Sequence, residues 1–136
     1  MFSIGELSRR CGVKIPTIRY YEQMGLITAP ERSEGNQRRY SSDGLKRLSF
    51  IRHSRELGFS IEDIRGLLEL SQHPEQPCRD AHKLAAQRLS DVRARIARLQ
   101  RLERELKRIS DCDADSIAHC AVIETLADHS LCETEH

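Results

Sequence analysis

Three of the five cysteines in this 136-residue chain occupy positions from which they could bind one metal ion. Cys78 comes just before a long stretch without Gly or Pro, and Cys112 and Cys120 follow that stretch. Thiolate sulfur prefers soft or borderline cations such as Zn(II), Cd(II), Pb(II), Hg(II) and Cu(I). An odd number of cysteines without an export signal argues against a disulfide framework. These thiols therefore predict a soft-metal site.

Other potential ligands lie around the last two of these cysteines. Asp113 and His119 are candidate auxiliary ligands, which leaves open whether one or two metal ions bind. The spacing between Cys112 and Cys120 is not that of a zinc finger, so the segment alone is a weak signal. Cys11 lies on the inner face of the first predicted helix and is expected to pack in the hydrophobic core. Three further residues are interpreted as a tail rather than as ligands: His129, Cys132 and His136.

The segment that separates these cysteines is predicted to be one long helix over residues 79–110. Apolar residues recur there with the 4-3 spacing of a coiled coil for roughly four heptads, interrupted at Glu103. So narrow an apolar stripe needs a partner helix, which predicts a homodimer. If the two helices pair antiparallel, Cys78 of one subunit approaches Cys112 and Cys120 of the other. Two equivalent three-thiol sites follow, whereas parallel pairing would separate the thiols.

The first part of the chain predicts a helix-turn-helix. A capping box at Ser3 and Glu6 begins one helix, which Gly12 ends, and Pro16 lies in the first turn of the next helix. The second helix is expected to present Thr17, Arg19 and Tyr20 outward, where they can contact a DNA major groove.

A two-stranded hairpin is predicted within residues 28–41, with Arg38 and Arg39 placed to contact a phosphate backbone. Ser42 or Asp43 is expected to cap a third helix, and Ser60 a fourth. The resulting organisation is a DNA-binding domain at 1–72, a hinge at 73–78, the dimerisation helix at 79–110, and a metal-binding loop and tail at 111–136.

The charge distribution points to the same division of the chain. Residues 1–60 carry 11 Lys or Arg against 6 Asp or Glu, whereas residues 61–136 carry 11 against 15. The first part therefore has a charge of +5 and the second −4, although the whole chain is close to neutral. A basic first part is typical of a segment that binds a polyanion. No apolar run is long enough for a transmembrane span and no signal peptide is evident, so a cytoplasmic location is predicted.

Several motifs resemble the signature of the MerR family of transcription regulators, in the same order, from residue 3 to about residue 70. They are Ile4-Gly5-Glu6-Leu7, Thr17-Ile18-Arg19-Tyr20-Tyr21-Glu22, Gly25-Leu26-Ile27, Arg32, Arg38, Tyr40, Arg47-Leu48-x-Phe50-Ile51-Arg52 and Leu57-Gly58-Phe59-Ser60. Gln37 departs from the family, which commonly has an aromatic residue there. The resemblance implies a mainly α fold, with a winged helix-turn-helix, a long antiparallel coiled-coil dimerisation helix and a short C-terminal metal-binding loop.

The resemblance also implies which residues bind the ligands. The DNA-binding candidates are Lys14, Thr17, Arg19, Tyr20, Gln37, Arg38 and Tyr40. In the metal-responsive branch of the family, two tail cysteines flank the metal-binding loop, matched here by Cys112 and Cys120. Monovalent sensors usually carry Ser at the start of the long helix, whereas divalent sensors carry Cys, as Cys78 does. Zn(II) or Cd(II) is therefore favoured, with Pb(II) and Hg(II) as alternatives within the divalent class.

The function implied is metal-dependent activation of transcription, not catalysis, because no phosphate loop or catalytic dyad is visible. The dimer would bind an inverted repeat in promoter DNA and distort it for RNA polymerase when metal binds. A Cu(I)- or Ag(I)-responsive activator of the same family is the alternative. A thiol redox sensor is less favoured, because the tail cysteines lack the close spacing of the family's iron–sulfur member.

Overall fold

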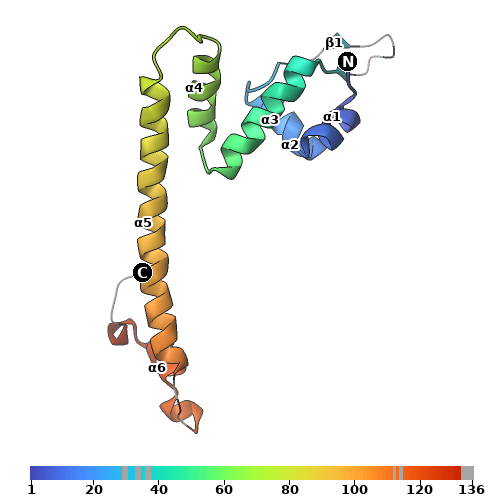
Figure 1. The fold of residues 1–136 in the computed structure, drawn as a ribbon. Helices are drawn as coiled ribbons and strands as arrows, with labels where there is room; N and C mark the ends of the chain where they lie inside the picture. Colours follow the sequence, from blue (N-terminus) through green and yellow to red (C-terminus); the bar gives the residue numbers. More distant parts are fainter. Residues whose placement is uncertain (29–30, 33–34, 36–37, 112, 114, 133–136) are drawn as a thin grey trace. The chain divides into compact units, whose positions relative to one another are not determined.

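The computed structural model of this chain describes residues 1–136 apart from 29–30, 33–34, 36–37, 112, 114 and 133–136 (Figure 1). The chain folds as two compact units, Met1–Leu84 and Ala85–His136. The elements of the first unit are α1 (Ile4–Cys11), α2 (Ile15–Gln23), β1 (Glu31–Arg32), β2 (Arg38–Arg39), α3 (Ser42–Glu56), α4 (Ile61–Ser71) and the start of α5 (Arg79–Ser110). The second unit holds the rest of α5, followed by η1 (Ile117–His119), α6 (Ala121–Ala127) and η2 (His129–Leu131). The predicted mainly α fold with a winged helix-turn-helix and a long helix is confirmed.

Serine side chains begin three of the helices in the first unit. The Oγ atom of Ser3 accepts a hydrogen bond from the Glu6 N–H at 3.2 Å, which confirms the predicted capping box. Ser60 caps α4 in the same way, accepting from an N–H at 3.0 Å. The cap of α3 is Ser41, which directly precedes the two expected candidates, Ser42 and Asp43. Each such cap stabilises its helix by about 1 kcal/mol.

One hydrophobic core holds α1, α2, α3 and α4 together. Leu7 of α1 and Ile18 of α2 are fully buried, and Cys11 is 4% exposed, which confirms that this cysteine packs in the core. A fully buried side chain of this size contributes about 1.5–3 kcal/mol relative to an exposed one. The other fully buried large side chains of the core are Leu26, Leu48, Ile51 and Ile64. The core therefore fixes the positions of α1 and α2 relative to the supporting helices, α3 and α4.

The predicted hairpin is present and is joined to the start of the chain. Its strands β1 and β2 pair antiparallel, with Arg32 opposite Arg38. Directly after β2, the N–H and C=O groups of Tyr40 exchange two hydrogen bonds of 2.7 Å with Phe2. Gln37 lies outside the described residues. The base of the hairpin is thus attached to the residues that lead into α1.

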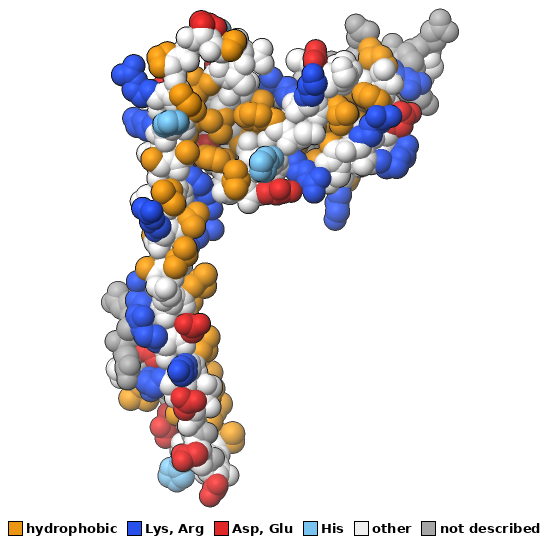
Figure 2. Space-filling view, viewed as in Figure 1, with side chains coloured by type: hydrophobic (Ala, Val, Ile, Leu, Met, Phe, Trp, Pro, Cys, Tyr) orange, Lys and Arg blue, Asp and Glu red, His pale blue; other side chains and the backbone are white. Residues whose placement is uncertain are grey.

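The long helix α5 has 32 residues, which corresponds to about 48 Å at ~1.5 Å per residue. Its bounds agree with the predicted 79–110. In the second unit its apolar stripe is exposed along the helix, at Leu89, Ile96, Leu99 and Leu106, and hydrophobic side chains follow it in Figure 2. Among the residues that the structure describes, none of the helices combines the length and apolar character needed to cross a membrane. The stripe is the surface that the predicted partner helix would cover.

Candidate nucleic-acid interface and candidate metal ligands

Helix α2 presents one buried face and one exposed face. Ile18 and Tyr21 point into the core, whereas Arg19 and Tyr20 are exposed. The rings of Tyr20 and Tyr21 lie 5.9 Å apart, centroid to centroid, at a tilted angle that is favourable for aromatic pairs. The exposed face therefore carries a guanidinium and a phenol on a helix whose other face is anchored. Both groups can donate hydrogen bonds to base edges or phosphates.

The other two candidates on this helix lie at its start. Lys14 is exposed and occupies the N-cap position of α2, and Thr17 in the first turn is half-buried. Pro16 has no N–H, and the Thr17 N–H donates to the Lys14 carbonyl at 2.9 Å. The attraction of this helix start for an anion therefore comes mainly from the partial positive charge of the helix dipole. With Lys14 beside it, this end of α2 suits a phosphate group.

Arginine side chains from the supporting helices hold α1 and α2 by their carboxyl ends, a feature that sequence reasoning missed. Arg52 of α3 donates from Nη1 to the Cys11 carbonyl at 2.8 Å, at the last residue of α1. Gly12 follows with a φ of 70°, and a Cβ atom there would clash with that same Nη1. The left-handed backbone at this position favours glycine, and a side chain there would push the Arg52 guanidinium away from the Cys11 carbonyl.

Two further arginine contacts lie at the end of α2 and just after it. Arg65 of α4 donates from Nη2 to the Met24 carbonyl at 2.7 Å, and Arg47 of α3 donates from Nε to the Leu26 carbonyl. Carbonyls at a helix C-terminus lack intrahelical partners, and a cation there also interacts favourably with the helix dipole. The candidate DNA-reading helix is thus positioned by α3 and α4 through polar contacts as well as through the core.

The wing residues predicted to contact DNA have different surroundings. Tyr40 is only 3% exposed, and its hydroxyl donates to the Glu22 carboxylate of α2. This side chain therefore joins the base of the wing to α2, and little of its surface remains for the DNA contact predicted for it. Arg38 lies in β2, where its backbone pairs with Arg32. The DNA contacts predicted for Arg38 and for Gln37, which is not among the described residues, stay predictions.

The candidate metal ligands lie at the two ends of α5. Cys78 is exposed immediately before the helix, and its carbonyl accepts from the His82 N–H at 2.9 Å. Cys120 is half-buried at the N-cap position of α6, where its carbonyl accepts from the Glu124 N–H at 3.0 Å. Both thiols are free, which suits them as soft-metal ligands. Cys112 lies outside the described residues.

The candidate auxiliary ligands are placed around η1 and in the tail. Asp113 and His119 are both exposed, and His119 ends η1 directly before Cys120. In the part of the single chain that the structure describes, no three His, Cys, Asp or Glu side chains converge in a way that could hold a metal ion. The predicted site takes its third thiol from a second subunit. Of the remaining tail residues, His129 lies in η2, and Cys132, at the C-cap of η2, has a free thiol. His136 lies outside the described residues.

Known proteins are similar to this chain in the helix-turn-helix part and along the long helix. Residues 2–71 match the family model described as MerR HTH family regulatory protein, and residues 45–109 match the model described as MerR, DNA binding. The chain is 42% identical over 130 residues to the HTH-type transcriptional regulator ZntR of Escherichia coli (strain K12), covering 93% of this chain and 92% of that protein. It is also 42% identical over 127 residues to the mercuric resistance operon regulatory protein of Bacillus cereus, covering 92% and 96% of the two chains.

A solved structure is similar over nearly the same length. It is the transcription regulator PbrR691 from Ralstonia metallidurans CH34 in complex with lead(II), which is 38% identical to this chain. The TM-score is 0.79, and the match covers 93% of this chain and 99% of that one. The similarity therefore extends through the long helix into the C-terminal segment that carries Cys120.

Proposed function

Since this chain belongs to the MerR family of helix-turn-helix regulatory proteins, we propose that a divalent soft metal ion switches its control of transcription. Members of this family are DNA-binding regulators and not enzymes, which confirms the prediction that the chain is not an enzyme. Its relatives include regulators that respond to metals, and this chain is a metal-responsive regulator of the same family.

The observation that supports the metal site is the position of cysteines in the sequence just before and just after α5. Cys78 directly precedes this helix, and Cys112 follows its last residue, Ser110, by two positions. About 48 Å of helix separates them in one chain, so a shared ion requires a second, antiparallel copy. In that homodimer, Cys78 of one subunit joins Cys112 and Cys120 of the other. Asp113 and His119 are the auxiliary ligands we propose for this site.

The third thiolate favours a divalent ion over Cu(I) or Ag(I). Three thiolates carry three negative charges, which a divalent cation compensates better than a monovalent one. Two similar proteins, one named for mercuric resistance and one solved with lead(II), support the same class of ion. We propose Zn(II), Cd(II) or Pb(II) as the activating ion, with Hg(II) as a further divalent candidate.

The action on DNA follows from the exposed face of α2 and from the wing. We propose that Lys14, Thr17, Arg19 and Tyr20, with Gln37 and Arg38 of the wing, contact each half of an inverted repeat in a promoter. The buried Tyr40 then acts by joining the base of the wing to α2. Metal binding then changes the distortion of the promoter so that RNA polymerase can use it. The deformation energy involved is on the order of a few kcal/mol, which the differential metal affinity of the two states must supply.

The experiment that tests this function is a titration of the metal-free homodimer with Zn(II), Cd(II), Pb(II), Hg(II) and Cu(I), one at a time, during transcription in vitro. A divalent ion should activate at the lowest free concentration. Activation by Cu(I) at a lower free concentration than any divalent ion would instead support the monovalent alternative.

Replacing Cys78 with serine should separate these two classes of ion. We expect Cys78→Ser to lower Cd(II) and Zn(II) affinity by at least roughly tenfold, because loss of a ligand costs no less than loss of an outer-shell partner. The Cu(I) affinity should fall less, since two thiolates suffice for Cu(I). Competition with chromophoric chelators measures both, and Cys132→Ser at the end of η2 is the matched control. An equal loss for Cu(I) and Cd(II) would refute the divalent preference.

A further inference from the structure

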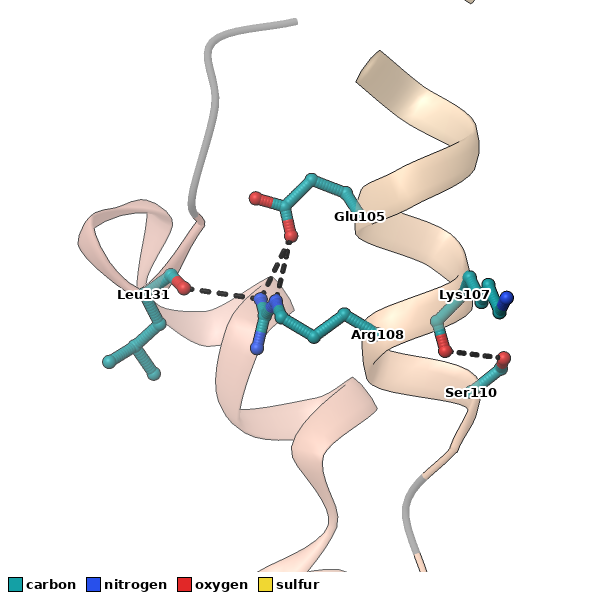
Figure 3. Close-up of polar contacts among 5 residues, drawn as sticks. All are labelled: Glu105, Lys107, Arg108, Ser110 and Leu131. Carbon is teal, nitrogen blue, oxygen red and sulfur yellow. Dashed lines mark hydrogen bonds and ion pairs between the residues drawn. The ribbon is translucent and has the colours of Figure 1, made fainter. Parts of the chain in front are cut away.

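An ion pair with a buried carboxylate and a partly exposed guanidinium lies at the end of α5, on the face that the C-terminal segment covers. Figure 3 shows the Arg108 guanidinium between the Glu105 carboxylate and the backbone of η2. Arg108 donates to Oε2 of Glu105 from Nε at 3.1 Å and from Nη2 at 2.9 Å. The same Nη2 donates to the Leu131 carbonyl at 3.1 Å, across 23 residues of sequence.

The burial of Glu105 distinguishes this pair from an ordinary surface ion pair. The Glu105 side chain is 7% exposed, whereas the Arg52–Glu56 pair on α3 has both side chains more than half exposed. A surface pair contributes little, but a buried carboxylate is costly unless it is paired and hydrogen-bonded. The Glu105 carboxylate is therefore stabilised by the Arg108 guanidinium, which also joins it to the backbone of η2.

The C-terminal segment depends on this face of α5. The buried residues of α5 are Glu105 and Ile109, which are four positions apart and so share one side of the helix. On the segment itself, Thr125 of α6 is also buried. Helix α6 has only seven residues, far fewer than the roughly 12–15 that an isolated helix needs to be even marginally stable. So short a helix depends on tertiary contacts, and here α6 packs against η2, which Arg108 joins to α5.

Cys120 is the N-cap residue of this short helix, and Leu131 lies just beyond the helix's other end. Between them, Asp128 accepts two hydrogen bonds from Ser130 and so makes η2 a compact turn. Residues 120–131 are thus one structured piece, held by Arg108 at the end farther from the thiol.

We propose that Arg108, paired with Glu105, is a positioning residue for the metal site: it fastens residues 120–131 to α5 and so holds the Cys120 thiol in place before metal binds. The inference rests on the proposed function, because it assigns Cys120 as a ligand. Fastening both ends of residues 111–130 lowers the entropy that metal binding must otherwise remove. Arg108 itself contacts no metal.

The test uses the full-length homodimer with Arg108→Met and the matched control Arg104→Met, an exposed arginine one turn earlier on α5. In the metal-free state, hydrogen exchange should show that Arg108→Met loses protection of amides 121–132, whereas Arg104→Met does not. The affinity for Cd(II), measured by chelator competition, should then fall roughly tenfold, the equivalent of one charge-assisted hydrogen bond. Operator affinity without metal should not change.

Two further variants show whether the effect of Arg108→Met comes from the lost hydrogen bonds, from the lost charge or from a failure to fold. Arg108→Lys keeps the charge but not the planar fork that reaches two acceptors, so it should behave like Arg108→Met. If Arg108→Met fails to fold, Glu105→Met/Arg108→Met removes both charges and tests the same bridge. Unchanged protection of amides 121–132, full rescue by lysine, or lost protection with unchanged Cd(II) affinity would each overturn the proposal.

If the unaltered protein bound no divalent metal, the proposed function would fail instead, and the exchange measurement would still decide whether Arg108 fastens the segment.

Discussion

Replacing Cys120 with serine is expected to abolish metal-dependent transcription and to leave operator binding unchanged. The loss of one of three thiolates should lower Cd(II) or Zn(II) affinity by at least roughly a hundredfold, above the cost of disturbing an outer-shell partner. Serine is well suited to test this, because it is a strong N-cap residue and Cys120 occupies the N-cap position of α6. The helix should therefore persist while the sulfur is lost.

The measurement pairs transcription in vitro with operator binding by the same preparation of protein. Cys132→Ser is the matched control, since it removes another free, half-buried thiol from the same C-terminal segment and is expected to leave the metal response unchanged. Loss of operator binding by Cys120→Ser would contradict the proposal that α2 and the wing bind DNA independently of the metal-binding cysteines.

Replacing Arg19 with alanine is expected to weaken operator binding by about 10- to 100-fold, in the metal-free and metal-bound forms alike. Arg19 lies on the exposed face of α2, next to the buried Ile18, so its removal leaves the core intact. A guanidinium that contacts a base or a phosphate loses both charge and hydrogen bonds when it is truncated. The effect should not depend on metal, because the proposed contact is expected in both states of the complex.

The operator affinity of Arg19→Ala is best measured across a range of salt concentrations. Arg93→Ala is the control, since Arg93 is an exposed arginine on α5 and its loss changes the net charge by the same amount. Loss of a phosphate contact should also reduce the salt dependence by about one counterion, whereas Arg93→Ala should not. A loss of affinity confined to the metal-bound form would show that Arg19 takes part in switching rather than in binding.

Much of the fold could be predicted because its signals are local. The capping serines Ser3 and Ser60, and the absence of Gly and Pro from 79–110, depend only on neighbouring residues, and the structure confirms the elements that they mark. The prediction of Ser42 or Asp43 as the cap of α3 was wrong, because three polar residues in a row, Ser41, Ser42 and Asp43, all suit an N-cap and the first of them is the cap.

The contacts that position the candidate sites could not be predicted, because they join residues far apart in sequence. Nothing local indicates that Arg52 or Arg65 donates to a carbonyl 41 residues away. The burial of Glu105 could not be predicted either, because it depends on the C-terminal segment. The heptad pattern drew attention to Glu103 instead, which is exposed. Charged side chains are usually exposed, so sequence reasoning places them at the surface by default.

The proposed function depends most on the claim that each metal site takes its thiols from two antiparallel subunits. Mixed dimers test this directly, with one subunit carrying Cys78→Ser and the other Cys112→Ser/Cys120→Ser. In the antiparallel arrangement, one end of the mixed dimer regains all three thiols and the other end loses all three.

The measurement is the number of Cd(II) ions that the purified mixed dimer retains against a competing chelator, together with the sulfur-to-cadmium charge-transfer absorption. A shared site predicts one tightly held Cd(II) per mixed dimer, and none in either parent homodimer. A mixed dimer that retains no more Cd(II) than its parents would contradict the shared site.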